Sequence, residues 1–165
     1  MNYETLIFDI DGTLWDSRAL VAKGYNAQLH DEGMEREGET LHNDPCNIGY
    51  PKVKETMAEL AKKHRLFIVS NAQCGYPELC IDKLGLGEYV QGHMCFGDTG
   101  ASKDVTIRML MEKHNVTDAI YIGDTQGDLE ACRKAGLPFI FCAYGLGNAD
   151  SYDVKIDRFE DLLTL

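Results

Sequence analysis

Five short apolar runs, each followed by polar or turn-forming residues, constrain the fold of this chain more than any other feature. The runs are shorter than a typical helix and are rich in isoleucine, leucine and phenylalanine. Apolar runs of this kind, without a polar residue at every second position, are typical of parallel strands covered on both faces. We therefore predict strands over residues 6–8, 66–69, 93–96, 119–122 and 138–142.

The segments between these runs carry apolar residues at helical spacing. Pro51 and Pro77 stand where first helical turns would begin, Ser102 is a candidate N-cap, and Gly136 is a candidate stop. We predict helices over residues 51–64, 77–85, 103–111 and 129–135, and a short terminal helix over 159–163. Alternating strands and helices with right-handed crossovers predict an α/β fold, a doubly wound parallel sheet in a three-layer sandwich.

Residues 16–50 depart from this alternation. They contain one helical stripe over 20–29 and then a polar stretch over 31–47, with no recognisable strand. We interpret the segment as a small helical excursion from a single domain that spans residues 1–165. His30, His42 and Cys46 lie within it, but their spacing matches no familiar zinc pattern.

The acidic composition bears on the partners of the chain. The formal net charge is -11, which repels phosphate backbones and anionic lipid, so we expect neither nucleic acid nor a membrane as a partner. The N-terminus has no basic leader and no stretch is long enough to span a membrane. The six cysteines form no C-x-x-C pair and are interpreted as buried, reduced thiols, so we expect a cytoplasmic protein.

Polar residues whose side chains could take part in catalysis or ligand binding follow three of the predicted strands. The carboxyl ends of parallel strands share one edge of a sheet, which is where ligands bind in such folds. A lysine stands at the predicted start of the helix before the fourth strand. The residues expected to meet at this edge are Asp9, Asp11, Ser70, Asn71, Lys103, Asp124 and Asp128.

The negative charges of the four carboxylates in this set must be offset by positive charge. Two like charges about 4 Å apart repel by roughly 4 kcal/mol at an effective dielectric constant of 20. A hard divalent cation with oxygen ligands is the natural remedy, and Mg²⁺ suits such a site. Lys103 adds positive charge, while Ser70 and Asn71 supply neutral donors, so the set could hold a phosphoryl group.

The segments "DIDGTL", "VSNAQ" and "GDTQGD", together with Lys103, resemble in order and setting the four motifs of the haloacid dehalogenase superfamily. The resemblance covers residues 5 to about 147, apart from residues 16–47. It implies a Rossmann-like three-layer sandwich. Larger members insert a full helical cap after the first motif, whereas residues 16–50 have room only for a much reduced cap.

The resemblance also implies roles for the individual residues. Asp9 would be the nucleophile, Asp11 the general acid and base, and Lys103 the residue that orients Asp9 and the phosphoryl group. Ser70 would bind that group, with Asn71 beside it. The Mg²⁺ ligands would be Asp9, the Asp11 carbonyl and Asp124, with Asp128 as a direct ligand or an outer partner.

We therefore predict a Mg²⁺-dependent phosphomonoester hydrolase that acts through an aspartyl-phosphate on Asp9. Dehalogenases lack an acid at the position of Asp11, which favours phosphoryl chemistry. Phosphoglycolate is one candidate among small phosphorylated metabolites. The small cap argues against a phosphomutase, and leaves room for a bulky substrate or for a lid completed by a second copy of the chain.

Two other functions remain open at this stage. A phosphoryl transferase would use the same residues with an acceptor other than water. A non-enzymatic signalling module would also carry a phosphorylatable aspartate, acidic neighbours, a lysine and Mg²⁺ on a doubly wound sheet. Such receiver domains would lack the Asp9-x-Asp11-Gly-Thr13 pattern and a Gly123-Asp124 motif after a late strand.

Overall fold

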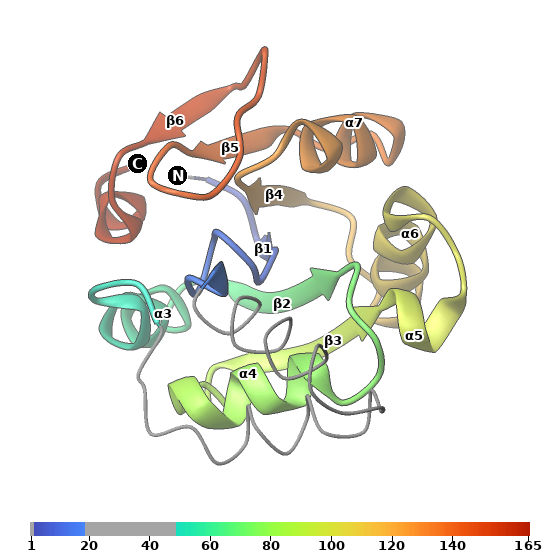
Figure 1. Ribbon diagram of the computed structural model, residues 1–165, viewed down its shortest axis with the longest axis horizontal. Coiled ribbons are helices and arrows are strands. Elements are labelled where there is room, and N and C mark those ends of the chain that lie inside the picture. Colours follow the sequence, from blue (N-terminus) through green and yellow to red (C-terminus); the bar gives the residue numbers. More distant parts are fainter. Residues whose placement is uncertain (1, 19–48) are drawn as a thin grey trace, which may run out of the picture.

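The chain forms a six-stranded, fully parallel sheet with helices on both faces (Figure 1). The computed structural model describes residues 2–18 and 49–165. The predicted α/β, doubly wound fold is confirmed. The strands are β1 (Thr5–Phe8), β2 (Arg65–Ser70), β3 (Val90–Cys95), β4 (Ala119–Gly123), β5 (Phe139–Cys142) and β6 (Val154–Ile156), in the order β3-β2-β1-β4-β5-β6.

The helices lie close to the predicted segments, except for α5 (Phe96–Thr99), which was not predicted. They are α3 (Val53–Leu60), α4 (Tyr76–Leu84), α5, α6 (Lys103–Lys113), α7 (Gln126–Lys134) and the 3-10 helix η1 (Phe159–Thr164). The first of these is shorter than the predicted 51–64. Gly85 ends α4 in the left-handed conformation, with φ at +63°, as a glycine does without the strain that a side chain would add.

Two details of the strands differ from the sequence-based expectation. The edge strand β6 was not predicted, because it is three residues long and its middle residue, Lys155, is exposed. Phe96 does not extend β3 but begins the short helix α5. The Asp98 carboxylate accepts a hydrogen bond of 2.8 Å from the Cys95 backbone N–H, which turns the chain out of the strand at that point.

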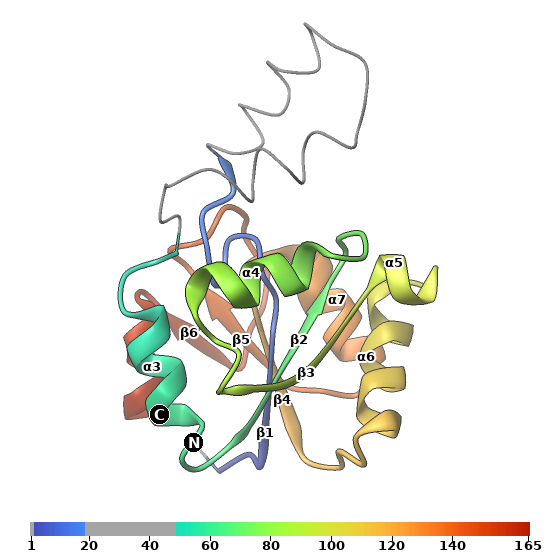
Figure 2. The same ribbon diagram turned by 90° about the horizontal axis from the view of Figure 1, so that it is seen from below.

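The strands bury side chains on both faces of the sheet. Leu6 and Phe8 of β1 pack with Met57 of α3 on one face, while Ile7 packs with Ile107 of α6 on the other. Figure 2 shows α3 on one side of the sheet and α6 on the opposite side. Successive strand side chains point to opposite faces, so the continuous apolar runs follow directly from the three-layer arrangement.

The sheet order determines where a ligand can bind. β1 lies between β2 and β4, and Phe8 pairs with Ile68 on one side and Ile122 on the other. The chain runs from β1 outward to β3 and then crosses back to β4, so the strand order reverses beside β1. Ligands of open α/β sheets bind at such a switch point, outside the carboxyl ends of the strands.

Several expectations concern residues that are not described. The helical stripe over 20–29, the polar stretch over 31–47 and the residues His30, His42 and Cys46 lie outside the described part of the chain. Within residues 2–18 and 49–165, no helix has both the length and the apolar character needed to cross a membrane.

Candidate active site

A buried lysine joins two of the predicted carboxylates at the carboxyl edge of the sheet. Asp9 follows β1, Lys103 is the first residue of α6, and Asp128 lies in the first turn of α7. The Lys103 ammonium donates to Asp9 Oδ1 at 2.8 Å and to Asp128 Oδ1 at 2.6 Å. All three side chains are more than nine-tenths buried. The predicted convergence of these residues, which lie far apart in sequence, is present in the fold.

Burial governs the proton affinity of this group. Burial removes water from Asp9 and raises its pKa to about 8. The negative charge of Asp128 also raises this pKa, whereas the positive charge of Lys103 lowers it. Burial alone would lower the pKa of Lys103, but the neighbouring Asp9, Tyr121 and Asp128 raise it well above its usual value. Lys103 is therefore a permanent positive charge beside the predicted nucleophile.

Asp124 presents toward the same site an oxygen that accepts no hydrogen bond from the described residues. It follows β4 and is fully buried. Its Oδ2 accepts hydrogen bonds from the backbone N–H groups of Leu146 at 2.7 Å and Gly147 at 3.1 Å. Its Oδ1 is buried and has no hydrogen-bond partner among the described residues. Burial raises the pKa of Asp124, so a buried carboxylate oxygen is left that a cation would stabilise.

The loop after β5 approaches Asp124 closely because it contains glycine. A Cβ at Gly145 would lie 2.3 Å from the Asp124 Cβ and 2.5 Å from the Gly12 carbonyl oxygen. Gly12 has φ at +80°, and a Cβ there would lie 2.0 Å from Asp124 Oδ2. These two glycines allow backbone to pack directly against the carboxylate, which fixes its orientation.

The acidic cluster fits a divalent cation with oxygen ligands. Carboxylate oxygens of Asp9, Asp124 and Asp128 lie within 4.8 Å of one another. Asp128 is already committed, since its Oδ1 accepts from Lys103 and its Oδ2 accepts from the Thr125 hydroxyl at 2.7 Å. Asp9 and the unpartnered Oδ1 of Asp124 are therefore the better placed ligands, and a hard ion such as Mg²⁺ suits them.

Asp11 is held in a different environment from Asp9. Its Oδ1 accepts a hydrogen bond of 2.6 Å from the Tyr76 hydroxyl and one of 3.2 Å from Trp15 Nε1. The two aromatic rings pack edge to face, with their centroids 5.5 Å apart. Tyr76 begins α4 and was missed by the sequence reasoning, because nothing in its spacing links it to Asp11. Trp15 is 1% exposed.

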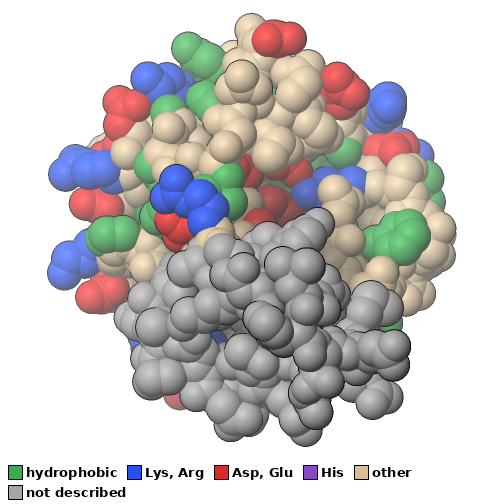
Figure 3. All heavy atoms as spheres, in the orientation of Figure 1, with side chains coloured by type: hydrophobic (Ala, Val, Ile, Leu, Met, Phe, Trp, Pro, Cys, Tyr) green, Lys and Arg blue, Asp and Glu red, His purple; other side chains and the backbone are tan. Residues whose placement is uncertain are grey.

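The two predicted phosphate-binding residues follow β2. Ser70 is the last residue of the strand and is 3% exposed, and its Oγ accepts a hydrogen bond of 3.2 Å from the Ala72 N–H. Asn71 is exposed. Figure 3 shows Asp and Glu side chains gathered at the centre of this face of the molecule, with Lys or Arg side chains beside them. The site is thus acidic with local positive charge, as the sequence predicted.

Known proteins share both the sequence pattern and the fold. The family model described as haloacid dehalogenase-like hydrolase matches residues 35–142. A phosphoglycolate phosphatase from Photorhabdus laumondii is 26% identical, with 96% of this chain and 90% of the relative covered. One from Vibrio parahaemolyticus is 28% identical, with 96% of this chain and 93% of the relative covered.

A solved structure extends the comparison to the fold. The haloacid dehalogenase-like hydrolase from Streptococcus pneumoniae has a TM-score of 0.77 at 17% identity, with 98% of this chain and 97% of that chain covered. The alignment with the Photorhabdus relative spans 212 positions, more than the 165 residues of this chain. That relative therefore has segments without a counterpart here. The extent of the family match shows that this chain belongs to the haloacid dehalogenase-like hydrolases.

Proposed function

We propose that this chain is a Mg²⁺-dependent phosphomonoester hydrolase in which Asp9 is the nucleophile and Asp11 the general acid and base. The observation that carries the proposal is the buried contact of Lys103 with both Asp9 and Asp128, 2.8 and 2.6 Å away, beside the unpartnered Oδ1 of Asp124. A carboxylate next to a fixed ammonium and a cation site can meet an anionic phosphoryl group, whereas an isolated acidic cluster would repel it.

In the first step, an Asp9 carboxylate oxygen attacks phosphorus and the bond from phosphorus to the ester oxygen breaks. Asp11, in its protonated form, gives its proton to the leaving oxygen, so the product leaves as an alcohol. Lys103 keeps the Asp9 carboxylate in place and offsets negative charge on the phosphoryl oxygens. The result is an aspartyl-phosphate on Asp9.

In the second step, Asp11 acts in the opposite direction. Its carboxylate removes a proton from a water molecule, whose oxygen attacks phosphorus. The bond between phosphorus and the Asp9 oxygen breaks, which releases inorganic phosphate and restores the Asp9 carboxylate. Because Tyr76 and Trp15 both bond to Asp11 Oδ1, we assign the proton transfers to the other oxygen, Oδ2.

Asp9, Asp124 and the Asp11 carbonyl would hold Mg²⁺, and Asp128 would act mainly through Lys103. A bound divalent cation supplies charge stabilisation for a phosphoryl group that is being transferred. Ser70 and Asn71, at the end of β2, would donate hydrogen bonds to the oxygens of that group. Together with Lys103, these donors would surround the phosphoryl group.

The substrate is proposed to be a small phosphorylated metabolite. The curated relatives are phosphoglycolate phosphatases, so phosphoglycolate is the first compound to assay. We also propose that residues 1–165 form a single domain, in which residues 16–50 are a reduced cap. A second copy of the chain could complete the lid.

Two rival functions share much of this chemistry. The sheet order disfavours a receiver-like signalling module. The strands here lie in the order 3-2-1-4-5-6, as in Rossmann-type folds, whereas receiver folds have the order 2-1-3-4-5. A phosphoryl transferase would turn over slowly without an acceptor. Release of phosphate in water alone, at a rate equal to that with added alcohols, would separate the hydrolase from it.

The proposed mechanism is tested by trapping the phosphoryl group. Wild-type protein quenched in acid during turnover of a radiolabelled phosphomonoester should carry a label that hydroxylamine removes, as expected of an acyl phosphate. Asp9→Asn should carry no label and should not hydrolyse an aryl phosphate. Asp82→Asn, which changes an exposed acid of α4, is the matched control and should retain both properties. A labelled or fully active Asp9→Asn variant would refute the mechanism.

A further inference from the structure

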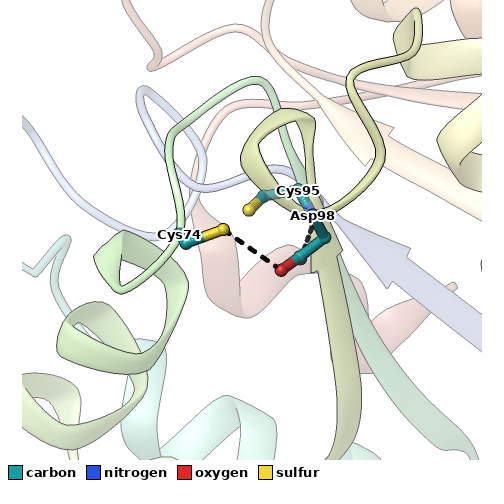
Figure 4. Close-up of side chains that lie close together, drawn as sticks. All are labelled: Cys74, Cys95 and Asp98. Carbon is teal, nitrogen blue, oxygen red and sulfur yellow. Dashed lines mark hydrogen bonds between the residues drawn. The ribbon is translucent and has the colours of Figure 1, made fainter.

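A second group of possible metal ligands lies apart from the acidic cluster. Cys74 is in the connection between β2 and α4, Cys95 ends β3, and Asp98 lies in α5. The three side chains point toward one another (Figure 4). Their two sulfur atoms and one carboxylate oxygen lie within 4.8 Å of one another. All five described cysteines are reduced, but Cys74 is exposed, contrary to the expectation of buried thiols only.

The backbone brings these residues together by a close approach of two segments. Ser70 pairs with Cys95 in the register of β2 and β3, so both segments leave the sheet at the same level. The Gly97 N–H then donates to the Ala72 carbonyl at 3.0 Å. A Cβ at Gly97 would lie 2.3 Å from the Cys74 backbone nitrogen, so glycine at this position permits the approach.

One distance between two of the ligand atoms is close to that expected around a tetrahedral ion. Cys74 Sγ lies 3.4 Å from Asp98 Oδ1. Metal–ligand distances of about 2.3 Å to sulfur and about 2.0 Å to oxygen place two ligands of a tetrahedral zinc about 3.5 Å apart. The other carboxylate oxygen, Asp98 Oδ2, is held by the Cys95 N–H at 2.8 Å. The carboxylate is therefore oriented before any ion binds, with Oδ1 toward the Cys74 thiol.

The cluster also has a route from solvent. Cys95 is 1% exposed, whereas Cys74 and Asp98 are exposed. Burial raises the pKa of Cys95 to about 11, and the hydrogen bond to Asp98 raises the pKa of Cys74, so both thiols carry protons in the metal-free protein at neutral pH. Binding of an ion to the thiolates must release these protons.

We propose that Cys74, Cys95 and Asp98 form a binding site for a thiophilic divalent cation of the Zn²⁺ class, with the fourth position open to solvent. Thiolate ligands favour such ions over Mg²⁺, so this site and the acidic cluster would select different metals. An ion here would tie the segment that follows Ser70 and Asn71 to the end of β3. The proposal does not depend on the proposed hydrolase function.

The same two thiols could instead serve as a redox pair that forms a disulfide. Asp98 favours the metal site, because a disulfide needs no carboxylate and the Asp98 oxygen lies against Cys74 Sγ as a third ligand. A disulfide is therefore treated as an outcome that would overturn the proposal.

Co²⁺ is the suitable probe, because thiolate-to-cobalt charge transfer absorbs in the near ultraviolet and reports sulfur ligands directly. Reduced, metal-free protein of full length is titrated with Co²⁺ in excess Mg²⁺, which occupies the acidic cluster. Saturation at one equivalent with charge-transfer absorption, reversed by Zn²⁺, is the expected result. Zn²⁺ should also raise the melting temperature, since a ligand of the folded state stabilises it.

The variants identify the ligands. Cys74→Ser changes an exposed residue, so the fold should persist. The Zn²⁺ affinity should fall by more than about 100-fold, beyond the cost of losing an outer partner. Gln73→Ala changes the exposed neighbour of Cys74 and should bind as wild type does. The proposal would be overturned if wild type showed no charge-transfer absorption, or if Cys74→Ser kept that absorption. It would also be overturned if Cys74 and Cys95 readily formed a disulfide that added metal does not prevent.

Discussion

The Tyr76 hydroxyl donates a hydrogen bond of 2.6 Å to Asp11 Oδ1, and thereby connects the first turn of α4 to the turn that follows β1. Burial raises the pKa of Tyr76, so the hydroxyl keeps its proton and remains a donor. Trp15 Nε1 bonds to the same carboxylate oxygen and to the Tyr76 oxygen, each at 3.2 Å. Asp11 is therefore held by hydrogen bonds from Tyr76 and Trp15, whereas Asp9 is held by the positive charge of Lys103.

This relationship predicts the effect of Tyr76→Phe. A hydrogen bond to a charged group contributes about 1.5–3 kcal/mol, so kcat should fall by about 10- to 100-fold if Asp11 is the proton donor. The loss should be larger for an alkyl phosphate than for a nitrophenyl phosphate, whose leaving oxygen needs no proton. Steady-state kinetics on the two substrates measure the difference. Tyr152→Phe, at an exposed tyrosine, is the control, and equal losses on both substrates would argue against this role.

The contact between Lys103 and its two carboxylates predicts a pH-dependent stability. Lys103→Met leaves Asp9 and Asp128 buried without their counter-charge, and breaking a buried pair costs about 3–5 kcal/mol. The folded variant can relieve this cost by holding protons that the unfolded chain releases, so its stability should fall as pH rises. The deficit relative to wild type should therefore be greater at pH 8 than at pH 5.

Urea unfolding of the metal-free proteins measures this deficit. Lys113→Met removes an exposed lysine from the last turn of the same helix and should change the free energy of unfolding little at either pH. A deficit in Lys103→Met that is constant with pH would show that lost packing, rather than unpaired charge, is responsible.

The sheet and much of the candidate site were predictable from sequence because each depends on local pattern and on parallel topology. β1 and β4 are continuous apolar runs buried on both faces, and parallel strands deliver Asp9 and Asp124 to one edge. The position of Lys103 was predictable although it lies far from both aspartates in sequence, because α6 begins at that same edge. These features required no knowledge of side-chain packing.

Other features depend on contacts that no short stretch of sequence encodes. The bond from Tyr76 to Asp11 joins residues 65 positions apart. The backbone donors for Asp124 are the N–H groups of Leu146 and Gly147 in the loop after β5. The Cys74 cluster forms because Gly97 allows two loops to meet. Such features are fixed by tertiary approach and so emerged only from the structure.

Metal removal should change the pH dependence of stability. Without a cation, burial raises the pKa of Asp9 from 3.8 to about 8, so between these values the folded state holds a proton that the unfolded chain has lost. Stability should therefore fall as pH rises through this range. Mg²⁺ favours the ionised carboxylates, so the rise in melting temperature that it produces should increase from pH 6 to pH 8.

Thermal unfolding with and without Mg²⁺, at constant ionic strength, tests this prediction. Asp124→Asn should lose most of the Mg²⁺ effect, because the unpartnered Oδ1 belongs to that residue. Asp82→Asn should retain it. A Mg²⁺ effect that does not change with pH would mean that the ion does not compete with protons for these carboxylates.

The close approach of the loop after β5 to Asp124 predicts that Gly145→Ala damages the cation site selectively. Its Cβ would lie 2.3 Å from the Asp124 Cβ and 2.5 Å from the Gly12 carbonyl, so the carboxylate must shift. Overpacking of this kind costs about 1–3 kcal/mol, and we expect a weaker Mg²⁺ affinity and a lower kcat. Gly87→Ala adds the same methyl group at a position where, apart from its chain neighbours, no atom of the described residues lies within 4 Å, and it should be neutral. If calorimetry finds equal Mg²⁺ affinities in the two variants, the loop does not position Asp124 for the metal.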